Sequence, residues 1–448
     1  MTELQEKLTA LRDFIWGEYL LIPLLAFVGI YLTIGLFAMP WRKIPLAISV
    51  LWGGRKKRVE QKGDITPFQA LMTELAATVG TGNIVGVATA IYFGGPGAIF
   101  WMWIIALFGM ATKYAEAVLA VTYREKDKNG NYVGGPMYYI RNGLGKNWQW
   151  MSGTFAFFAM IAAFGIGNMV QSNSVADEMF STFQIPFWLT GLIMSILVSI
   201  VIIGGVKRIA KVASKLIPLM AITYITTALI IVMINLDRIP EIITLIVESA
   251  FHGAAASGGF LGASVWMAIR MGFARGIFSN EAGLGSAPIA HAAAETNNPV
   301  NQGMIAMLGV FIDTIVICSL TAFVILLTGA FESGAKGASM TSLAFSSALY
   351  GYGGYVVSFG LVLFAFTTIL GWSYYGEKCA SYLLGTRVVL FYRFFWISAI
   401  FIGAIIKLEL VWLLADIANG LMALPNLIAL LFLSPIVIVK TRIYFLKK

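Results

Sequence analysis

The sequence GTGNIVG, residues 80–86, interrupts an apolar segment at residues 67–93 that is long enough to cross a membrane. Spanning the hydrocarbon core takes about 20 mainly apolar residues. Glycine and polar residues in mid-span weaken a helix, and backbone groups left unpaired in lipid cost several kcal/mol each. Such a segment persists where the irregular backbone lines a cavity. The sequence therefore predicts a discontinuous membrane helix that has something to bind.

A second segment of the same kind lies five predicted spans further along the chain. It is GFARGIFSNEAGLGSAP, residues 272–288, within the apolar stretch 262–291. Two interrupted helices at corresponding positions of two halves are the best indication, from sequence, of a transporter's binding site. We therefore expect an inverted repeat, although the two halves share no clear residue-level similarity.

Composition supports a membrane protein throughout. Of the 448 residues, 59% are hydrophobic and 12% are charged, against roughly 25% charged in soluble domains. Mean hydropathy is +0.82. We predict a polytopic all-α membrane protein with about eleven transmembrane helices, at roughly 15–39, 67–93, 98–122, 151–176, 186–205, 214–235, 262–291, 301–329, 354–376, 388–407 and 411–438. The shorter stretch 43–53 is predicted to lie at the membrane interface.

Lysine and arginine alternate between rich and poor loops, which predicts the orientation. The loop after the first span carries Arg42, Lys43, Arg55, Lys56, Lys57, Arg58 and Lys62, and every second loop repeats this bias to the C-terminal Lys447 and Lys448. The opposite loops have few, chiefly Arg238, Lys336 and Lys407. The C-terminus is therefore predicted to be cytoplasmic and the N-terminus extracellular, in the cell membrane.

No soluble domain remains, so residues 1–448 are predicted to form one transmembrane domain. We expect an extra helix and cytoplasmic loop at 15–66, a first repeat at 67–235 and a second at 262–438. The net charge of +9 sits in short loops rather than in a groove-reading patch, so nucleic acid is not an expected partner. No enzyme is expected, because HExxH, GxSxG and Walker A motifs are missing from the sequence. The two histidines, His252 and His291, exclude a histidine-rich metal centre.

Three motifs resemble the alanine or glycine:cation symporter family, and the resemblance runs through nearly the whole chain. They are GTGNIVGVATAIYFGGPGAIF (80–100), GGPMYYI (134–140) and FARGIFSNEAGLGSAPIAHAAA (273–294). That family belongs to the amino acid–polyamine–organocation superfamily. The resemblance implies the five-plus-five inverted repeat of the bacterial leucine transporter, preceded by one extra helix. It also implies import of small neutral amino acids, alanine and glycine, driven by Na⁺ as coupling ion and without another cofactor. Recognition by backbone amides and carbonyls, with a tiny side chain, would also admit D-alanine.

The substrate carboxylate is expected at free backbone amides of the first break. An unwound segment at the positive end of a half-helix supplies such donors. Gly80, Thr81 and Gly82 are assigned to the carboxylate, and Thr78 and Val79 next to them are predicted to be substrate-binding residues. The alternative is close helix packing through small residues, which fits Gly86 better.

The second break is expected to hold the ammonium group and the side chain of the substrate. Carbonyls would come from Phe273, Ala274 and Gly276, and a hydroxyl from Ser279. Phe273 and Ile277 would wall a pocket of alanine size, unless they only pack. Arg275 would attract an anionic group, or would pair with Glu281 or Glu74 as a gate.

Two amides three positions apart, Asn168 and Gln171, are predicted to share one face of the fourth span. Gln171 is the candidate for contact with the carboxylate, where the leucine transporter uses a tyrosine. Hydrogen bonding between helices is the alternative for both.

The cation site follows from the resemblance. It implies carbonyls of Ala76, Val79 and either Phe364 or Ala365, with the hydroxyls of Thr367 and Thr368. Oxygen ligands of this kind suit a hard cation such as Na⁺. The alternative is a threonine pair bonded to its own helix. Asn83 is a candidate for a second cation site whose other ligands the sequence does not reveal.

Five ionisable residues lie at apparent membrane depth, where such groups are functional candidates. They are Glu74, Glu116, Arg275, Glu281 and Asp313. An alternative function, a proton-coupled or exchanging amino-acid carrier, would need Asp313 or Glu281 to titrate. Trp372 is a further candidate to cap the pocket. A channel fits the hydropathy alone, but two broken helices favour a carrier.

Overall fold

The computed structural model describes residues 3–17, 19–55, 61–252, 264–406 and 409–446. Outside these ranges lie Lys56, Lys57, Arg58, Lys407, Lys447 and Lys448 of the orientation argument, and the outermost residues of two predicted spans, 262–263 and 407. The N-terminal part contains α1 Glu3–Ile15, α2 Leu21–Gly35, α3 Met39–Arg42 and α4 Ile44–Gly53. Of these, α4 matches the predicted interfacial stretch.

The first predicted repeat begins at a helix that is capped by its own sequence. Thr66 accepts from the amide of Gln69, and the Gln69 side chain accepts from the amide of Thr66. The elements are α5 Pro67–Thr78, the π-helix η1 Gly82–Gly86, α6 Val87–Gly94, α7 Gly97–Thr122, β1 Glu125–Lys126, β2 Tyr132–Val133, α8 Pro136–Tyr139, η2 Ile140–Leu144, η3 Lys146–Trp148, α9 Gln149–Phe164, η4 Gly165–Met169, α10 Val170–Phe183, α11 Phe187–Ile202 and α12 Gly205–Ile234.

The remainder of the chain holds the second predicted repeat. η5 Leu236–Arg238 and α13 Ile239–His252 precede it. Its elements are α14 Val265–Asn280, α15 Pro288–His291, α16 Pro299–Val310, the π-helix η7 Phe311–Cys318, α17 Ser319–Leu327, η8 Ala330–Ser333, α18 Ala338–Ala348, α19 Gly353–Leu384, η9 Thr386–Val388, α20 Val389–Ile405 and α21 Glu409–Leu446. Both halves thus open on a helix that is interrupted after a short first piece.

Each of the eleven predicted spans corresponds to a described helix or a broken pair. Seven described helices are long and apolar enough to cross a membrane, and α5 with η1–α6 makes an eighth. The shorter apolar helices α2 and α11 match two more, and α14 with α15 matches the last. Two further helices, α13 and α18, lie between spans and were not expected.

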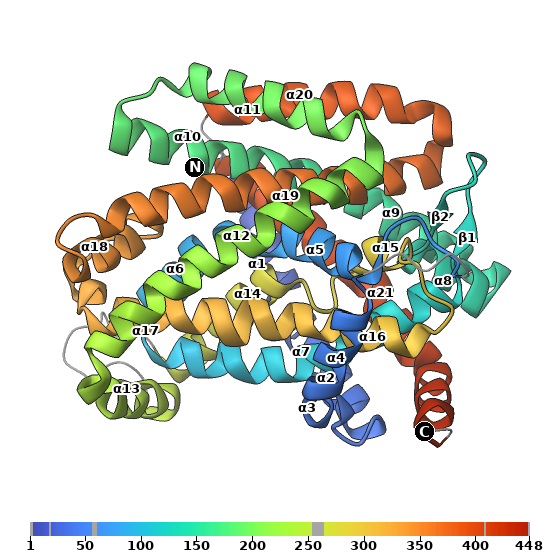
Figure 1. Cartoon of the computed structure of the whole chain (residues 1–448), viewed down its shortest axis with the longest axis horizontal. Coiled ribbons are helices and arrows are strands. Elements are labelled where there is room, and N and C mark those ends of the chain that lie inside the picture. Colours follow the sequence, from blue (N-terminus) through green and yellow to red (C-terminus); the bar gives the residue numbers. More distant parts are fainter. Residues whose placement is uncertain (1–2, 18, 56–60, 253–263, 407–408, 447–448) are drawn as a thin grey trace.

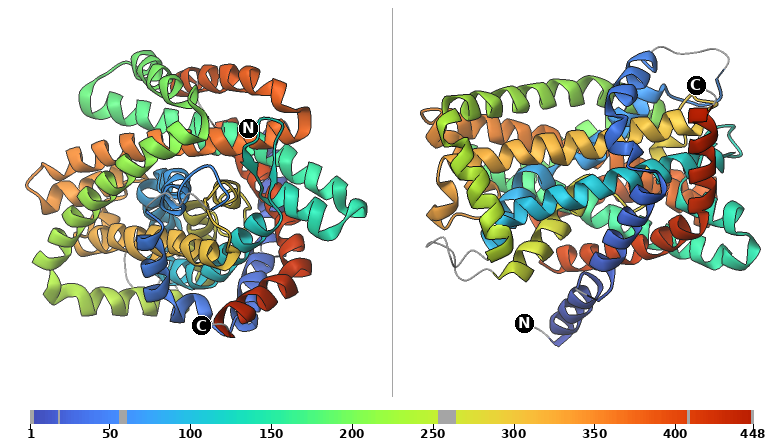
Figure 2. Two further views of the ribbon diagram at one scale, coloured as in Figure 1. Left: turned by 45° about the vertical axis from the view of Figure 1, so that its right-hand side comes forward. Right: turned by 90° about the horizontal axis from the view of Figure 1, so that it is seen from below.

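Most of the spans, α7, α12, α16 and α19 among them, run side by side along the long axis of the molecule (Figures 1 and 2). α13 and α18 lie at one end, which the lysine and arginine pattern predicts to be extracellular (left in Figure 1). The β1–β2 hairpin, α15 and the C-terminus lie at the other end, predicted to be cytoplasmic. The pair α11 and α20 lies to one side, beyond α10 and α19.

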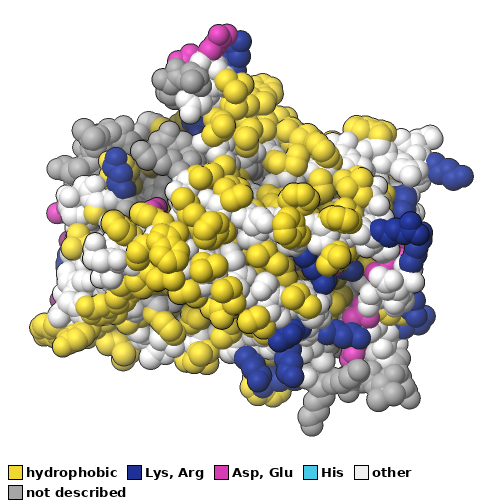
Figure 3. Space-filling view, turned by 90° about the horizontal axis from the view of Figure 1, so that it is seen from above, with side chains coloured by type: hydrophobic (Ala, Val, Ile, Leu, Met, Phe, Trp, Pro, Cys, Tyr) yellow, Lys and Arg dark blue, Asp and Glu magenta, His cyan; other side chains and the backbone are white. Residues whose placement is uncertain are grey.

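The surface shows why this chain needs lipid. Large apolar side chains such as Ile203, Phe391 and Phe432 are 67%, 65% and 59% exposed. Hydrophobic side chains cover the middle of the face in Figure 3, whereas many lysine and arginine side chains gather at its right-hand, predicted cytoplasmic end. An apolar belt of this extent is stable only against hydrocarbon.

Candidate functional site

The first helix breaks where the sequence predicts. α5 ends at Thr78, Val79 is extended (φ −75°, ψ 97°), and the chain turns by 53° before it resumes at Gly82. The break is thus confined to Val79–Thr81 and lies among buried residues. The prediction of a discontinuous helix is confirmed at this position.

The break exposes two backbone donors. The amide of Gly80 donates to Oδ1 of Asn83 at 2.9 Å. The amides of Thr81 and Gly82 open the next helical stretch, where N–H groups have no preceding turn to bond. These two amides also lie at the positive end of that stretch. They are therefore the available donors for an anion, while the amide of Gly80 is already used.

Three other elements meet the break at its glycines. A Cβ on Gly80 would lie 2.6 Å from Oγ1 of Thr368 and 3.6 Å from Oε1 of Gln171. A Cβ on Gly82 would lie 3.0 Å from Cα of Ser279. Residues of α10, α14 and α19 that the sequence singled out are therefore gathered around this backbone.

Gln171 and Asn168 do not act together. Nε2 of Gln171 donates to Oγ1 of Thr81 at 3.2 Å, and Oε1 of Gln171 has no hydrogen-bond partner among the described residues. Nδ2 of Asn168 donates instead to the carbonyl of Trp396 on α20. The prediction of one shared face is wrong because the π-helix η4 changes the helical phase just before α10. Asn168 connects two helices, and Gln171 reaches the first break.

The second break lies further along the chain than predicted. α14 is helical from Val265 to Asn280, so the expectation that the backbone is irregular from Gly272 onward is wrong. The carbonyls of Phe273, Ala274 and Gly276 therefore belong to helical turns. A Cβ on Gly272 would lie 2.3 Å from the carbonyl oxygen of Ala98 on α7, so this glycine serves close packing.

Residues 281–287 form the break itself. Glu281 caps α14 in the left-handed region (φ 57°), and Gly283 (φ 88°) and Gly285 (φ 84°) keep the chain from returning to a helix. Ser279 and Ile277 precede the break and are buried. Phe273 lies two turns earlier, edge-on to Trp101 of α7.

Buried side chains from three other helices pin this irregular backbone. Oε1 of Glu116 accepts from the amide of Gly285 at 3.1 Å. Nδ2 of Asn426 donates to Oε1 of Glu116 and to the carbonyl of Gly283, at 2.6 and 2.9 Å. Trp372 donates to Glu281 at 2.9 Å, and Ser286 also bonds that carboxylate. Glu116, Glu281 and Trp372 thus have structural partners that the sequence could not assign.

The threonine pair of α19 donates hydrogen bonds to its own helix, which is the alternative to a cation site given by the sequence. Oγ1 of Thr368 donates to the carbonyl of Phe364 at 2.9 Å, and Oγ1 of Thr367 donates to the same carbonyl at 3.0 Å. A hydroxyl that donates in this way still has lone pairs to offer. The two residues differ in direction, because Thr368 meets Gly80 whereas Thr367 lies 3.8 Å from the sulfur of Met220.

A polar cluster on η7 supplies the partners of Asn83 that the sequence did not reveal. Nδ2 of Asn83 donates to Oδ1 of Asp313 at 2.7 Å, and Thr314 donates to Oδ2 at 2.8 Å. Nδ2 of Asn280 donates to Oγ1 of Thr314. The cluster joins the first break to the last residue of α14. Its oxygens suit a hard cation, and no trio of His, Cys, Asp or Glu gathers as a metal site among the described residues.

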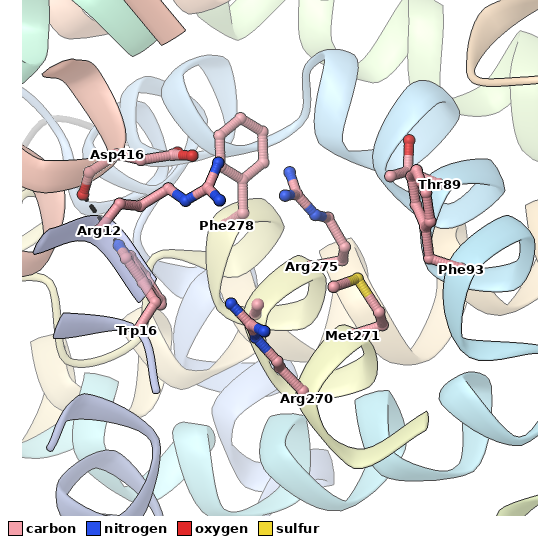
Figure 4. A pocket seen from close by; sticks show the side chains of 10 residues that line it. Arg12, Trp16, Thr89, Phe93, Arg270, Met271, Arg275, Phe278 and Asp416 are labelled. Atoms are coloured by element: carbon pink, nitrogen blue, oxygen red, sulfur yellow. Dashed lines mark hydrogen bonds between the residues drawn. The ribbon is translucent and has the colours of Figure 1, made fainter. Parts of the chain in front are cut away.

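Arg275 lies outside this centre. It lines a cavity of about 260 Å³ on the predicted extracellular side, between α6, α14, α21 and the N-terminal residues (Figure 4). Arg12 and Arg270 line the same cavity, and Arg270 pairs with Asp13 at 2.8 Å. The expected ion pair of Arg275 with Glu281 or Glu74 is wrong. The guanidinium lies over the ring of Phe278 on the same helix, α14, before the second break begins.

Comparison with known proteins identifies relatives over the full length. The sequence profile described as "Sodium:alanine symporter family" matches residues 1–448. The sodium/alanine symporter AgcS of Methanococcus maripaludis is 48% identical, over 97% of this chain and 95% of its own. The probable sodium/glutamine symporter GlnT of Bacillus subtilis is 41% identical, over 98% and 90%.

Among solved structures, the chain is similar to MhsT, which was crystallised in complex with L-phenylalanine. The TM-score is 0.56, with 13% sequence identity over 84% of this chain and 98% of MhsT. At this identity the likeness concerns the fold alone. It confirms the expected leucine-transporter-like architecture of two broken-helix repeats.

Proposed function

Because this chain belongs to the sodium:alanine symporter family, we propose that it is a secondary active symporter that imports alanine and glycine with Na⁺ by alternating access. The family membership supports cation-coupled amino-acid transport. The particular substrate and ion rest on the chemistry of the two breaks.

The contact between the two broken helices carries the proposal. The free amides of Thr81 and Gly82 lie at the positive end of one helical stretch, and Ser279 near the negative end of α14 touches Gly82. The last carbonyls of α14, those of Phe278 and Ser279, have no following helical turn to pair with. Opposite helix ends in contact complement a zwitterion: the amides bind the carboxylate and the carbonyls bind the ammonium group.

Gln171 completes the carboxylate side. Its amide nitrogen already bonds Thr81 at 3.2 Å, and its position beside Gly80 allows the same group to turn toward a bound carboxylate. Among the pocket-wall candidates, Phe273 and Ile277 are buried on α14. In this proposal they restrict the side chain of the substrate to a methyl group or a hydrogen.

The coupling cation binds at the other end of the first break. The last carbonyls of α5, from Ala76 onward, lack a continuing helix to bond, and Val79 lies in the break itself. Thr368 of α19 meets Gly80 at this point, with Thr367 and the carbonyl of Phe364 or Ala365 close by in sequence. Asn83, Asp313 and Thr314 provide a second group of oxygens for a cation near the substrate.

Equilibrium binding to the purified protein tests the proposal. Radiolabelled alanine should bind tightly in Na⁺ and weakly when choline replaces Na⁺, and unlabelled glycine should displace it. Binding of equal strength in the two media would remove the cation from the mechanism.

A second candidate substrate is glutamine, since the probable sodium/glutamine symporter GlnT is 41% identical to this chain. The same helix ends would bind its α-carboxylate and α-ammonium groups, and only the wall of the pocket would differ. Displacement of labelled alanine by glutamine as effective as that by glycine would favour this candidate.

A further inference from the structure

A buried charged cluster that the transport site does not use joins the two broken helices. Nζ of Lys113 on α7 lies 3.3 Å from Oε1 of Glu74 on α5, and Nε2 of His291 on α15 bonds the other oxygen of Glu74. The side chains of all three residues are 0% exposed. Glu74 lies one turn before the first break and His291 one turn after the second. The cluster therefore connects α5, the predicted cytoplasmic half of the first broken helix, to α15, the predicted cytoplasmic half of the second.

The fourth member, Gln302 on α16, can serve His291 in either protonation state. Nε2 of Gln302 lies 2.6 Å from Nδ1 of His291, while Oε1 of Gln302 has no partner among the described residues. A neutral imidazole can accept from the amide nitrogen at Nδ1. An imidazolium donates at both nitrogens, and rotating the amide presents the unused oxygen to Nδ1 while Glu74 accepts from Nε2. Adding a proton thus breaks no hydrogen bond of the ring.

The same glutamine borders a way to the surface. Gln302 lines a cavity of about 430 Å³ on the predicted cytoplasmic side, together with Gln61, Thr296, Asn298 and Asn301. These polar side chains can hold water, which carries protons as far as the amide. The Gln302 side chain thus lies between the buried imidazole and this cavity.

The surroundings of the imidazole set the electrostatic balance. Charged and titratable groups on the neighbouring elements are Glu74 on α5, Lys113, Glu116 and Arg124 around α7, Glu281 in the second break, Tyr375 on α19 and Glu295 after α15. A proton on His291 adds one positive charge to this buried region, close to the end of α5. Like charges in a low-dielectric interior repel strongly.

We propose that His291 is a proton-binding site, in exchange with the cytoplasm past Gln302, and that its proton and the coupling cation at the first break oppose each other. This opposition rests on the cation site proposed above, whereas the proton site itself does not. Because such coupling is reciprocal, Na⁺ should favour the neutral imidazole, and acid should weaken Na⁺ binding.

The first test observes the proton directly. The chain has two histidines, and His252 is exposed, with its Nδ1 3.2 Å from the carbonyl oxygen of Glu248 in its own helix, so His252→Gln leaves His291 as the single histidine. Its imidazole resonances should shift with pH in detergent or nanodiscs, and Na⁺ without alanine should move that titration to lower pH. Resonances that ignore pH, or that titrate identically with and without Na⁺, would overturn the inference.

The second test uses transport by the full chain. In native protein the Na⁺ concentration needed for half-maximal alanine uptake should rise about five- to tenfold when the pH is lowered across the titration of His291. His291→Gln should make this requirement independent of pH, and His252→Gln should keep the native dependence. An unchanged pH dependence in His291→Gln refutes the proposal. Loss of Na⁺-driven uptake in native protein would instead refute the proposed function.

Discussion

Gly80 and Gly82 are the residues at which a single substitution tests the proposed carboxylate site most directly. Gly82→Ala places a methyl group 3.0 Å from Cα of Ser279, so the two helix ends must separate or the break must rewind. Either change costs a hydrogen bond to the charged substrate, about 1.5–3 kcal/mol. We expect alanine affinity to fall at least about tenfold, measured by equilibrium binding in saturating Na⁺.

Gly86→Ala is the matched control for this substitution. Gly86 lies in the same π-helix, but a Cβ there meets no atom within 4 Å. It should leave alanine affinity within about twofold of native, which is a change of roughly 0.4 kcal/mol. Similar losses in both variants would mean that the glycines only serve helix packing.

The hydroxyl pair on α19 should contribute unequally to the coupling ion. Thr368 faces Gly80 in the first break, whereas Thr367 lies beside Met220 of α12. Thr368→Val keeps the volume and removes one oxygen ligand, so the Na⁺ concentration for half-maximal alanine binding should rise about tenfold, equivalent to about 1.4 kcal/mol. Thr367→Val should raise it less. Native sodium dependence in both variants would move the cation away from this helix.

At this scale the sequence predicts residue types better than partners. Gln171, the candidate suggested by the resemblance to the leucine transporter, lies beside the first break and bonds Thr81 there. Asn168 was placed wrongly, since a π-turn is not visible in hydropathy. Lys113 was missed altogether, because its partner Glu74, which also bonds His291, comes from a distant segment and only the fold brings them together.

The two broken helices differ in how well their sequences reveal them. In the first, two glycines flank one threonine in the middle of the span, and the break lies there. In the second, the glycines have two different structural roles. Gly272 allows close packing on α7, whereas Gly283 and Gly285 adopt positive φ. Composition alone does not separate close packing from a left-handed backbone, so the break was expected several residues too early.

The pinning of the second break makes a prediction about α21. Asn426→Ala removes the donor to Glu116 and to the carbonyl of Gly283, and leaves both buried without that bond. Each such loss costs about 1–3 kcal/mol, so the variant should unfold at clearly lower temperature in detergent and transport more slowly.

Asn419→Ala on the same helix is the comparison. Asn419 is equally buried, but its amide oxygen has no hydrogen-bond partner among the described residues. The thermal stability of this variant should change much less. Equal destabilisation by the two substitutions would show that the loss of stability comes from removing any buried side chain of α21. It would not come from the hydrogen bonds that Asn426 makes to the second break.

For the molecule as a whole, hydropathy predicted the number and order of the spans because the lipid requirement acts on every helix separately. The short connecting helices α13 and α18 escaped prediction, since neither is an apolar segment long enough to cross the core. The division into repeats at 67–235 and 262–438 and the cytoplasmic C-terminus stay predictions.

Substrate size is a property of the whole pocket. If Phe273, Ile277 and Trp372 close it, glycine and both enantiomers of alanine should displace labelled alanine, while leucine and phenylalanine should not. A buried pocket loses about 1–3 kcal/mol when overpacked, so leucine should need at least about tenfold higher concentration. Leucine competing as well as glycine would show that these side chains do not form the wall.

The proposed function requires that the chain concentrates alanine by using a Na⁺ gradient. The direct measurement is uptake of radiolabelled alanine into proteoliposomes with Na⁺ outside, with equal Na⁺ on both sides, or with choline outside. A Na⁺-coupled symporter should accumulate alanine transiently above the external concentration only under the inward Na⁺ gradient, and a sodium ionophore should abolish this accumulation. Accumulation that is unchanged in choline and driven by an inward proton gradient would contradict it.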